Sequence, residues 1–257
     1  MKISEMETPA LILDLDKMRK NIHAMQELVA TCGIPLRPHY KSHKCPQVAH
    51  WQMEAGAIGM TCAKLGEAED LVNSGIKDIL IANQIIHPAK FARLAYLAKV
   101  CHLGVCVDHE ENIYNLEKAV ALAGSTLYCL IEYEVGMHRC GVDTKEEFLR
   151  LAKIINASPH LVYEGIQAYA GHMAHWKDYE TRKDGSHQVD LRVKELIDYL
   201  TEHGLPPKKV SGISTGTSMF KFKGIYNEMQ AGSYLFMDGA YGEMNLNFIN
   251  ALFILSE

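Results

Sequence analysis

The sequence predicts an α/β protein whose parallel strands and crossover helices close into a (β/α)8 TIM-like barrel. From residue 34 onward, short runs of apolar and β-branched residues alternate with longer segments whose apolar residues recur at helical spacing. This alternation is typical of parallel strands joined by helical crossovers. About eight such units in about 220 residues favour a closed barrel. The main alternative, an open doubly wound sheet, usually carries a G-x-G-x-x-G turn after an early strand, and this sequence has none.

The expected elements follow in order along the chain. Residues 10–15 predict a first strand, and residues 16–33 predict a helix that begins at Asp16 and ends at Gly33. The barrel strands are expected at residues 34–40, 57–63, 78–83, 102–108, 127–134, 161–171, 209–215 and 229–238. The helices that connect them are expected at residues 45–56, 64–75, 87–99, 109–124, 144–157 and 186–204.

Composition limits the classes of function. The chain has 257 residues, 48% of them hydrophobic and 22% charged, which is ordinary for a globular protein. A formal net charge of -5 argues against nucleic acid or a membrane surface as the main partner. We expect no signal peptide and no transmembrane helix, because no long apolar run is present. Seven cysteines without C-x-x-C pairing favour a reducing, cytoplasmic location over a disulfide framework or a zinc ribbon.

The segment RPHYKSHK, residues 37–44, gathers basic character in an acidic chain. A solvated basic patch is one interpretation, and a site for an anionic cofactor is the other. Lys41 falls at the carboxyl end of the first expected barrel strand, the face on which barrel enzymes work. A lysine placed there among other cations can have a lowered pKa, which makes its amine a usable nucleophile.

Two short segments predict a phosphate site. Loops after barrel strands seven and eight often bind phosphate, and here they contain STGTS (residues 214–218) and QAGSY (residues 230–234). Small residues let backbone N–H groups approach a phosphate, and the hydroxyls of Thr215, Thr217 and Ser233 add donors. Two ordinary tight turns are the alternative. Both segments fall at the expected positions, and an amine beside a phosphate site suits pyridoxal 5′-phosphate.

Arg139 follows the fifth expected strand, in the segment EYEVGMHRCGV. An arginine there can bond the phenolic oxygen of the cofactor through its planar fork. The alternative is a surface ion pair with Glu132 or Glu134.

The end of the sixth expected strand offers a further set of polar side chains. The histidines His172 and His175 could bind a metal or transfer protons. Without a carboxylate or cysteine beside them, they are weak evidence for a metal site. Gln167 and Tyr169 precede them on the same strand.

Several segments together resemble the family of D-threonine aldolases and eukaryotic-type D-serine dehydratases, which are fold type III pyridoxal phosphate enzymes with an alanine-racemase-like N-terminal barrel. The block LRPHYKSHKCP carries most of the resemblance; TPALILDL, VGMHRCGV, GIQAYAGH, STGT and MQAGSYLFMD follow the family's order. The resemblance covers essentially the whole chain. It implies a pyridoxal-phosphate-dependent lyase of D-configured 3-hydroxy amino acids, acting by aldol cleavage to glycine and an aldehyde or by dehydration of D-serine.

The resemblance also implies roles for single residues. Lys41 matches the lysine that binds the cofactor covalently, and Arg139 matches the arginine beside its phenolic oxygen. His172 is the candidate for proton transfer or for metal-assisted binding of the substrate hydroxyl. Gln230 falls where alanine racemases place the arginine that faces the pyridine nitrogen, which argues against a racemase. Further cofactor contacts are expected from Gln167, Tyr169, Ser214, Thr215, Gly216, Thr217, Gly232, Ser233 and Tyr234.

This chain differs from the family pattern in sequence and in length. Glu134 and His138 replace an aspartate and an asparagine of the family pattern. Members of the family continue into a C-terminal β domain that supplies the ligands of a manganese or zinc ion. We therefore expect a barrel over residues 1–250, the start of a truncated or absent C-terminal domain at residues 251–257, and no metal ligand within this chain. By analogy we expect a homodimer. The alternative functions are a barrel that binds or carries pyridoxal phosphate without robust catalysis, and an amino-acid racemase.

Overall fold

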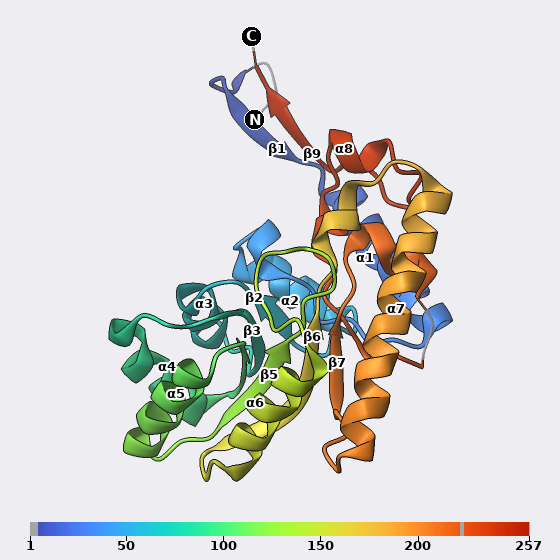
Figure 1. Ribbon diagram of the computed structural model, residues 1–257. Coiled ribbons are helices and arrows are strands. Elements are labelled where there is room, and N and C mark those ends of the chain that lie inside the picture. Colours follow the sequence, from blue (N-terminus) through green and yellow to red (C-terminus); the bar gives the residue numbers. More distant parts are fainter. Residues whose placement is uncertain (1–4, 222–223, 257) are drawn as a thin grey trace.

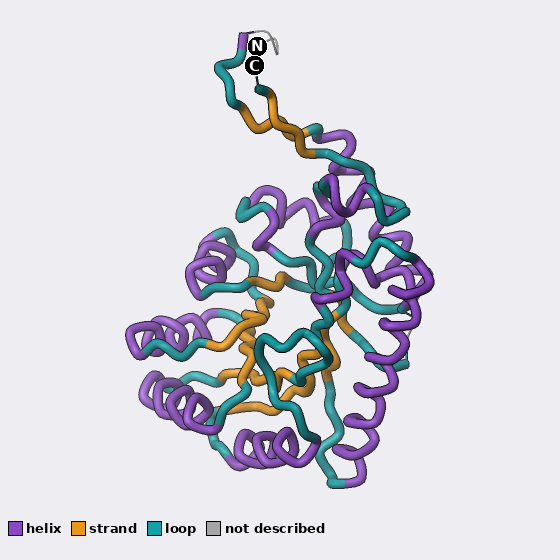
Figure 2. The backbone as a smooth tube through the Cα atoms, turned by 45° about the horizontal axis from the view of Figure 1, so that its top comes forward, coloured by secondary structure: helices purple, strands orange, loops and turns teal. Residues whose placement is uncertain are grey.

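The computed structural model describes residues 5–221 and 224–256, and at its centre a parallel sheet curls into a barrel. Seven strands lie in sequence order, each hydrogen-bonded in parallel to the next. Figure 2 shows these strands surrounded by helices. The predicted fold class is therefore confirmed. The strands are β2 (Met60–Cys62), β3 (Asp78–Gln84), β4 (His102–Val107), β5 (Leu127–Glu132), β6 (Leu161–Ala168), β7 (Lys209–Gly212) and β8 (Glu228–Met229).

The predicted first barrel strand, residues 34–40, closes the barrel as an irregular segment. Leu36 pairs in parallel with Met229 of β8, and His39 pairs in parallel with Thr61 of β2. The segment contains two prolines, which lack the N–H groups that a continuous strand ladder requires. The prediction of a regular strand here is wrong, but the segment lies between β8 and β2, as the eighth position of the barrel.

Three other predicted strands end earlier than expected and turn into short 3-10 helices at the carboxyl end of the barrel. Ile213, directly after β7, has a φ of 60°, which interrupts strand geometry. These turns replace the ends of the strands predicted at 161–171, 209–215 and 229–238. They are η3 (Gly171–His175), η4 (Thr215–Phe220) and η5 (Ser233–Leu235); a fourth, η2 (Tyr40–Ser42), follows the irregular segment.

The helices cover the outside of the barrel, and all six predicted connecting helices are present. α7 begins earlier than the predicted residue 186, because the Asp178 side chain accepts from the N–H of Thr181 and caps the helix. The helix continues through Gly185, where a Cβ would lie 2.7 Å from the Trp176 ring. The helices are α1 (Leu15–Cys32), α2 (Pro46–Glu54), α3 (Leu65–Asn73), α4 (Pro88–Val100), α5 (Glu110–Ala123), α6 (Lys145–Ala157), α7 (Tyr179–Glu202) and α8 (Gly239–Gly242).

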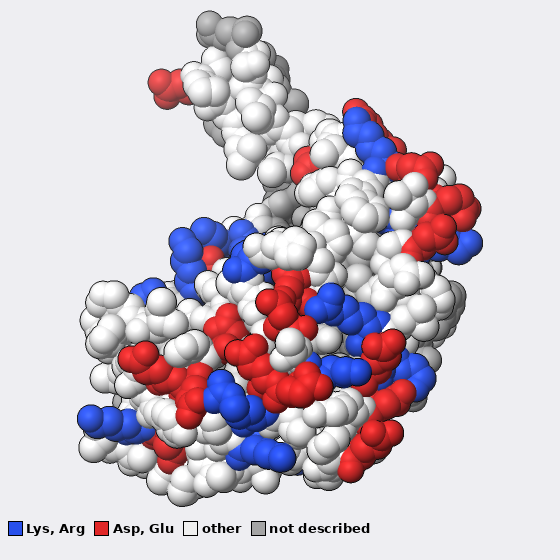
Figure 3. Space-filling model, viewed as in Figure 1, with Lys and Arg blue, Asp and Glu red and all other residues white. Residues whose placement is uncertain are grey.

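A two-stranded arm projects from the barrel (Figure 1). The predicted first strand forms β1 (Ala10–Leu13), which pairs antiparallel with β9 (Leu252–Leu255). Asp14, rather than the predicted Asp16, caps α1, because its side chain accepts from the N–H of Lys17 at 3.1 Å. Figure 3 shows interspersed acidic and basic side chains over the barrel and few on the arm. The predicted boundary between the barrel (residues 1–250) and the start of a C-terminal domain (residues 251–257) stays a prediction. Residue 257 lies outside the described residues.

Ionised side chains form a cluster at the amino-terminal ends of the strands, in which Arg37 and Glu228 are buried and Asp78 and His102 are partly exposed. Arg37 Nε donates to Glu228 Oε2 at 2.8 Å, and Arg37 Nη1 donates to Asp78 Oδ1 at 2.7 Å. His102 joins the cluster, with Nδ1 3.3 Å from Asp78 Oδ1 and Nε2 3.6 Å from Glu164 Oε1. The cluster ties β3, β4, β6 and β8 to the irregular segment, at the end of the barrel opposite to the 3-10 turns.

Raising the pH should lower the free energy of unfolding, because His102 loses its proton. Hydrogen bonds with Asp78 and Glu164 raise the pKa of His102 from 6.5 to about 9. Protonated His102 therefore stabilises the fold fully below about pH 6.5, and this contribution is lost as the pH rises through about 9. Urea titrations should show the wild-type protein losing stability in this range relative to a His102→Gln variant. A His23→Gln variant, changed on the exposed face of α1, should keep the wild-type dependence; the same loss in all three proteins would exclude His102 as the cause.

Among the described residues, no helix combines the length and hydrophobicity that crossing a membrane requires.

Candidate active site

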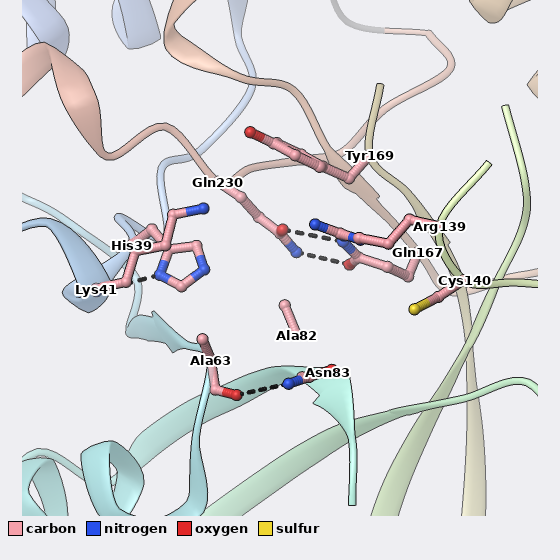
Figure 4. Close-up of a pocket in the computed structure, with 10 residues that line it drawn as sticks. All are labelled: His39, Lys41, Ala63, Ala82, Asn83, Arg139, Cys140, Gln167, Tyr169 and Gln230. Carbon is pink, nitrogen blue, oxygen red and sulfur yellow. Dashed lines mark hydrogen bonds between the residues drawn. The ribbon is translucent and has the colours of Figure 1, made fainter. Parts of the chain in front are cut away.

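A pocket lies at the carboxyl end of the barrel strands, and Figure 4 shows the side chains around it. Its volume is about 210 Å³, which suits a small molecule. Five predicted site residues line it: Lys41, Arg139, Gln167, Tyr169 and Gln230. The sequence interpretation assigned no separate role to the other lining residues, which are His39, Ala63, Ala82, Asn83 and Cys140.

Lys41 supplies an amine to the pocket from η2. Its Nζ lies 5.7 Å from the centre of the Tyr169 ring, and its backbone N–H donates to His39 Nδ1 at 3.3 Å. Burial of the ammonium group lowers the pKa of Lys41, and the positive charge of Arg139 lowers it further. Both effects increase the fraction of neutral amine, which is the nucleophilic form.

His39 lines the pocket, and the sequence interpretation misjudged its charge. It was counted among the basic residues of the segment 37–44, but burial lowers its pKa to about 3. Burial also lowers the pKa of His43 to about 4. Arg37 is bound in the ion cluster at the other end of the barrel. The segment therefore forms no continuous cationic patch, and Lys41 is its contribution of positive charge to the pocket.

Arg139 places a second cation beside the pocket. Its Cζ lies 5.9 Å from the centre of the Tyr169 ring, and its Nη2 lies 3.5 Å from Glu132 Oε1. Gln84 Nε2 donates to the other oxygen of Glu132 at 2.6 Å. The ion pair considered as the alternative for Arg139 is thus present with Glu132, and Arg139 lines the pocket as well.

The loop that carries Arg139 is held by the Glu134 carboxylate, which accepts hydrogen bonds from three successive backbone N–H groups, those of residues 136 to 138. Burial alone would raise the pKa of Glu134, but the three donors outweigh it and lower the pKa. Glu134 therefore stabilises the conformation of this loop.

Gln167 and Gln230 form a reciprocal pair at the buried side of the pocket. Gln167 Nε2 donates to Gln230 Oε1 at 3.0 Å, and Gln230 Nε2 donates to Gln167 Oε1 at 2.7 Å. Figure 4 shows the two amides facing each other, with the Arg139 and Tyr169 side chains close by. Burial raises the pKa of Tyr169 to about 12, so its hydroxyl is neutral.

The two turns predicted to bind phosphate lie against each other beside Lys41. The backbone N–H of Tyr234 donates to Thr215 Oγ1 at 3.0 Å, which joins η5 to η4. A Cβ on Gly232 would lie 2.8 Å from Ser42 Oγ and 3.0 Å from His39 Cβ, so glycine is needed for this close approach. The two turns and η2 therefore pack together at one end of the barrel.

Four backbone donors in these turns have no hydrogen-bond acceptor among the described residues. They are the N–H groups of Thr215, Gly216, Gly232 and Ser233. A bound anion can satisfy such unpaired donors. This arrangement fits a phosphate group next to the amine of Lys41.

Three other predicted residues of these turns support the backbone instead of offering free groups. Ser214 Oγ lies 3.2 Å from Thr217 Oγ1, a contact that holds the η4 turn together. The Tyr234 side chain is buried, and its hydroxyl accepts from Gln52 Nε2 at 2.7 Å. Tyr234 thus contributes to the turn through its backbone.

His172 and His175 lie on η3, next to the loop that carries Arg139. Neither lines the pocket. His172 approaches Gly136 closely, its Nδ1 is buried without a hydrogen-bond partner, and burial lowers its pKa. His175 packs against the Tyr241 ring at 4.7 Å. Within residues 5–221 and 224–256, no group of three or more His, Cys, Asp or Glu side chains could hold a metal ion.

Comparison with known proteins identifies the family. Residues 13–240 match the family described as alanine racemase, N-terminal domain. The chain belongs to this family. It is 42% identical to 3-hydroxy-D-aspartate aldolase of Paracoccus denitrificans (strain Pd 1222), covering 100% of this chain and 69% of the relative. It is 38% identical to D-threonine aldolase of Arthrobacter sp, covering 99% of this chain and 68% of the relative.

Solved structures agree with this assignment. The D-threonine aldolase from Filomicrobium marinum superposes with a TM-score of 0.94 and 37% identity, over 98% of this chain and 70% of that one. The D-threo-3-hydroxyaspartate dehydratase from Delftia sp. HT23 superposes with a TM-score of 0.90 and 28% identity, over 97% of this chain and 67% of that one. The family resemblance inferred from the sequence motifs is therefore confirmed.

Proposed function

We propose that the chain is a pyridoxal-phosphate-dependent lyase that acts on D-configured 3-hydroxy amino acids. The observation that carries the proposal is the Lys41 amine, with its lowered pKa, beside Arg139 and beside two turns with unpaired backbone donors. The relatives named as D-threonine and 3-hydroxy-D-aspartate aldolases support aldol cleavage. A D-threo-3-hydroxyaspartate dehydratase from Delftia sp. (strain HT23), 30% identical, supports dehydration as the second reaction type.

The residues around the pocket fit the cofactor. The free N–H groups of Thr215, Gly216, Gly232 and Ser233 would bind its phosphate, and Ser214, Thr217 and Tyr234 would hold those turns in place. The amine of Lys41 would bind its aldehyde carbon, and the Arg139 guanidinium would bind its phenolic oxygen. Gln167, Tyr169 and Gln230 would surround the ring. When bound, the cofactor accepts the electron pair released as a bond at the substrate Cα or Cβ breaks.

His172 is the proposed proton carrier. Burial lowers its pKa, so the imidazole is neutral near pH 7 and can accept a proton. Its Nδ1 has no hydrogen-bond partner among the described residues. Because His172 does not line the pocket, its proposed task of taking the proton of the substrate 3-hydroxyl rests on the family resemblance. Aldol cleavage requires removal of that proton as the Cα–Cβ bond breaks.

The remaining expectations from the resemblance complete the proposal. We propose that residues 1–250 form the catalytic barrel and that a manganese or zinc ion takes part in the reaction, as the family resemblance implies. We also propose a homodimer in the cytoplasm, with a small D-amino acid as substrate and with neither nucleic acid nor membrane as partner.

The experiment is an absorbance titration of the purified chain with pyridoxal phosphate. D-threonine and D-serine are then added in turn, with manganese or zinc. A visible band that substrate shifts, with release of glycine and aldehyde or of a 2-oxo acid, would support the lyase. A band that no substrate disturbs would favour a protein that binds or carries the cofactor. Conversion of D- to L-amino acid would favour a racemase.

A further inference from the structure

A row of buried polar side chains leads from the pocket into the barrel interior. Gln230 lines the pocket, and Ser211, Glu228 and Arg37 follow behind it, each at most 3% exposed. Barrel interiors are usually filled by branched apolar residues, and burial of polar groups costs free energy unless they are hydrogen-bonded. The proposed lyase function places Gln230 beside the cofactor ring, but it assigns no role to Ser211, Glu228 or Arg37.

The hydrogen bonds in this row can run in only one direction. The Glu228 carboxylate, which accepts from Arg37 Nε at 2.8 Å, is an acceptor at both oxygens. Ser211 Oγ lies 2.7 Å from Glu228 Oε1 and must donate its single proton there. Once that proton is used, Ser211 can only accept a further hydrogen bond. The Gln230 atom 2.8 Å from Ser211 Oγ must therefore be the donor Nε2.

This direction determines what Gln230 can offer to a ligand. One N–H of its Nε2 goes to Ser211 Oγ, and the other goes to Gln167 Oε1 at 2.7 Å. Its Oε1 accepts from Gln167 Nε2 at 3.0 Å and keeps one free lone pair. Gln230 thus has no donor left and can act toward a ligand only as an acceptor.

We propose that Arg37, Glu228 and Ser211 form a positioning relay that locks the Gln230 amide, so that the pocket presents a hydrogen-bond acceptor to the ring nitrogen of a bound pyridine cofactor. A hydrogen bond to an acceptor requires the ring nitrogen to carry a proton, so the amide oxygen favours the protonated form. The resulting pyridinium draws electrons more strongly than the neutral ring. The relay thereby tunes the cofactor without touching it. This inference rests on the proposed function and adds three positioning residues to it.

The wild-type chain tests the relay directly. It is loaded with pyridoxal phosphate labelled with nitrogen-15 in the ring, and the NMR shift of that nitrogen distinguishes the protonated from the unprotonated form. We expect the protonated form in neutral and mildly alkaline buffer. An unprotonated ring nitrogen in a Lys41-dependent complex would overturn the relay alone. The absence of any Lys41-dependent complex would overturn the proposed function instead.

Ser211→Ala removes the acceptor that holds the Gln230 amide. We expect its ring nitrogen to shift toward the unprotonated form, while the dissociation constant of the cofactor rises by no more than about tenfold. Ser211→Thr keeps the hydroxyl and should restore the wild-type shift. Asp78→Asn weakens the other partner of Arg37 without touching Ser211, so its ring nitrogen should stay protonated. A protonated nitrogen in Ser211→Ala would overturn the relay; if this variant does not fold, the wild-type shift decides.

Discussion

Replacing Lys41 by alanine should abolish covalent attachment of the cofactor and reduce lyase activity by at least about 10³-fold. The Lys41 amine has a lowered pKa in the pocket, through burial and through the charge of Arg139. The nearby Lys44 directs its Nζ toward Glu67 Oε1 at 3.6 Å, so it cannot take the place of Lys41 without breaking that ion pair. The measurements are the visible absorbance of bound cofactor and the rate of aldehyde release from D-threonine.

Lys44→Ala is the matched control for this prediction. It removes the same charge and side chain three residues further along the chain, from a lysine that does not line the pocket. The visible band and the rate of aldehyde release should both stay close to wild type. A band that survives in Lys41→Ala but is lost in Lys44→Ala would place the attachment point at the other lysine.

The sequence predicted the helices and the central strands well, because each carries its own periodic apolar pattern. Its errors concentrate where contacts distant in sequence decide the backbone. The segment 34–40 has the composition of a strand, but its prolines allow only isolated pairing with β2 and β8. The first turns of α7 have the composition of a polar loop, but they are helical in the structure, where Gly185 packs against Trp176.

The sequence also predicted several of the residues that line the pocket. Lys41, Arg139 and Tyr169 follow strands or strand-like segments, and the carboxyl ends of barrel strands converge on one face. Burial could not be inferred from the motif itself. His39 therefore looked cationic, although its surroundings keep it neutral. Arg37 also looked available for an anion, but its partner Glu228 lies 191 residues further along the chain.

Replacing Arg37 by methionine should cost about 3–5 kcal/mol of unfolding free energy. Its side chain fills space beside Gly59, where a Cβ would lie 2.1 Å from Arg37 Nη1. Burial alone would lower the pKa of Arg37, but Glu228 and Asp78 outweigh it and raise the pKa, so the charged form is the one held in the barrel. Methionine keeps much of the packing but leaves the Glu228 carboxylate buried without this partner. Urea unfolding monitored by circular dichroism measures the loss.

Two further variants separate the effect of charge from that of packing. Arg93→Met removes an arginine whose ion pair with Glu69 lies on the surface, and its unfolding midpoint should stay close to wild type. The double variant Arg37→Met, Glu228→Met removes both buried charges and should recover part of the stability lost in the single variant. Lys209, which lies 3.8 Å from Glu228, keeps its closer partner Glu164 at 2.9 Å. A double variant less stable than Arg37→Met alone would show that lost packing, and not the unpaired carboxylate, sets the cost.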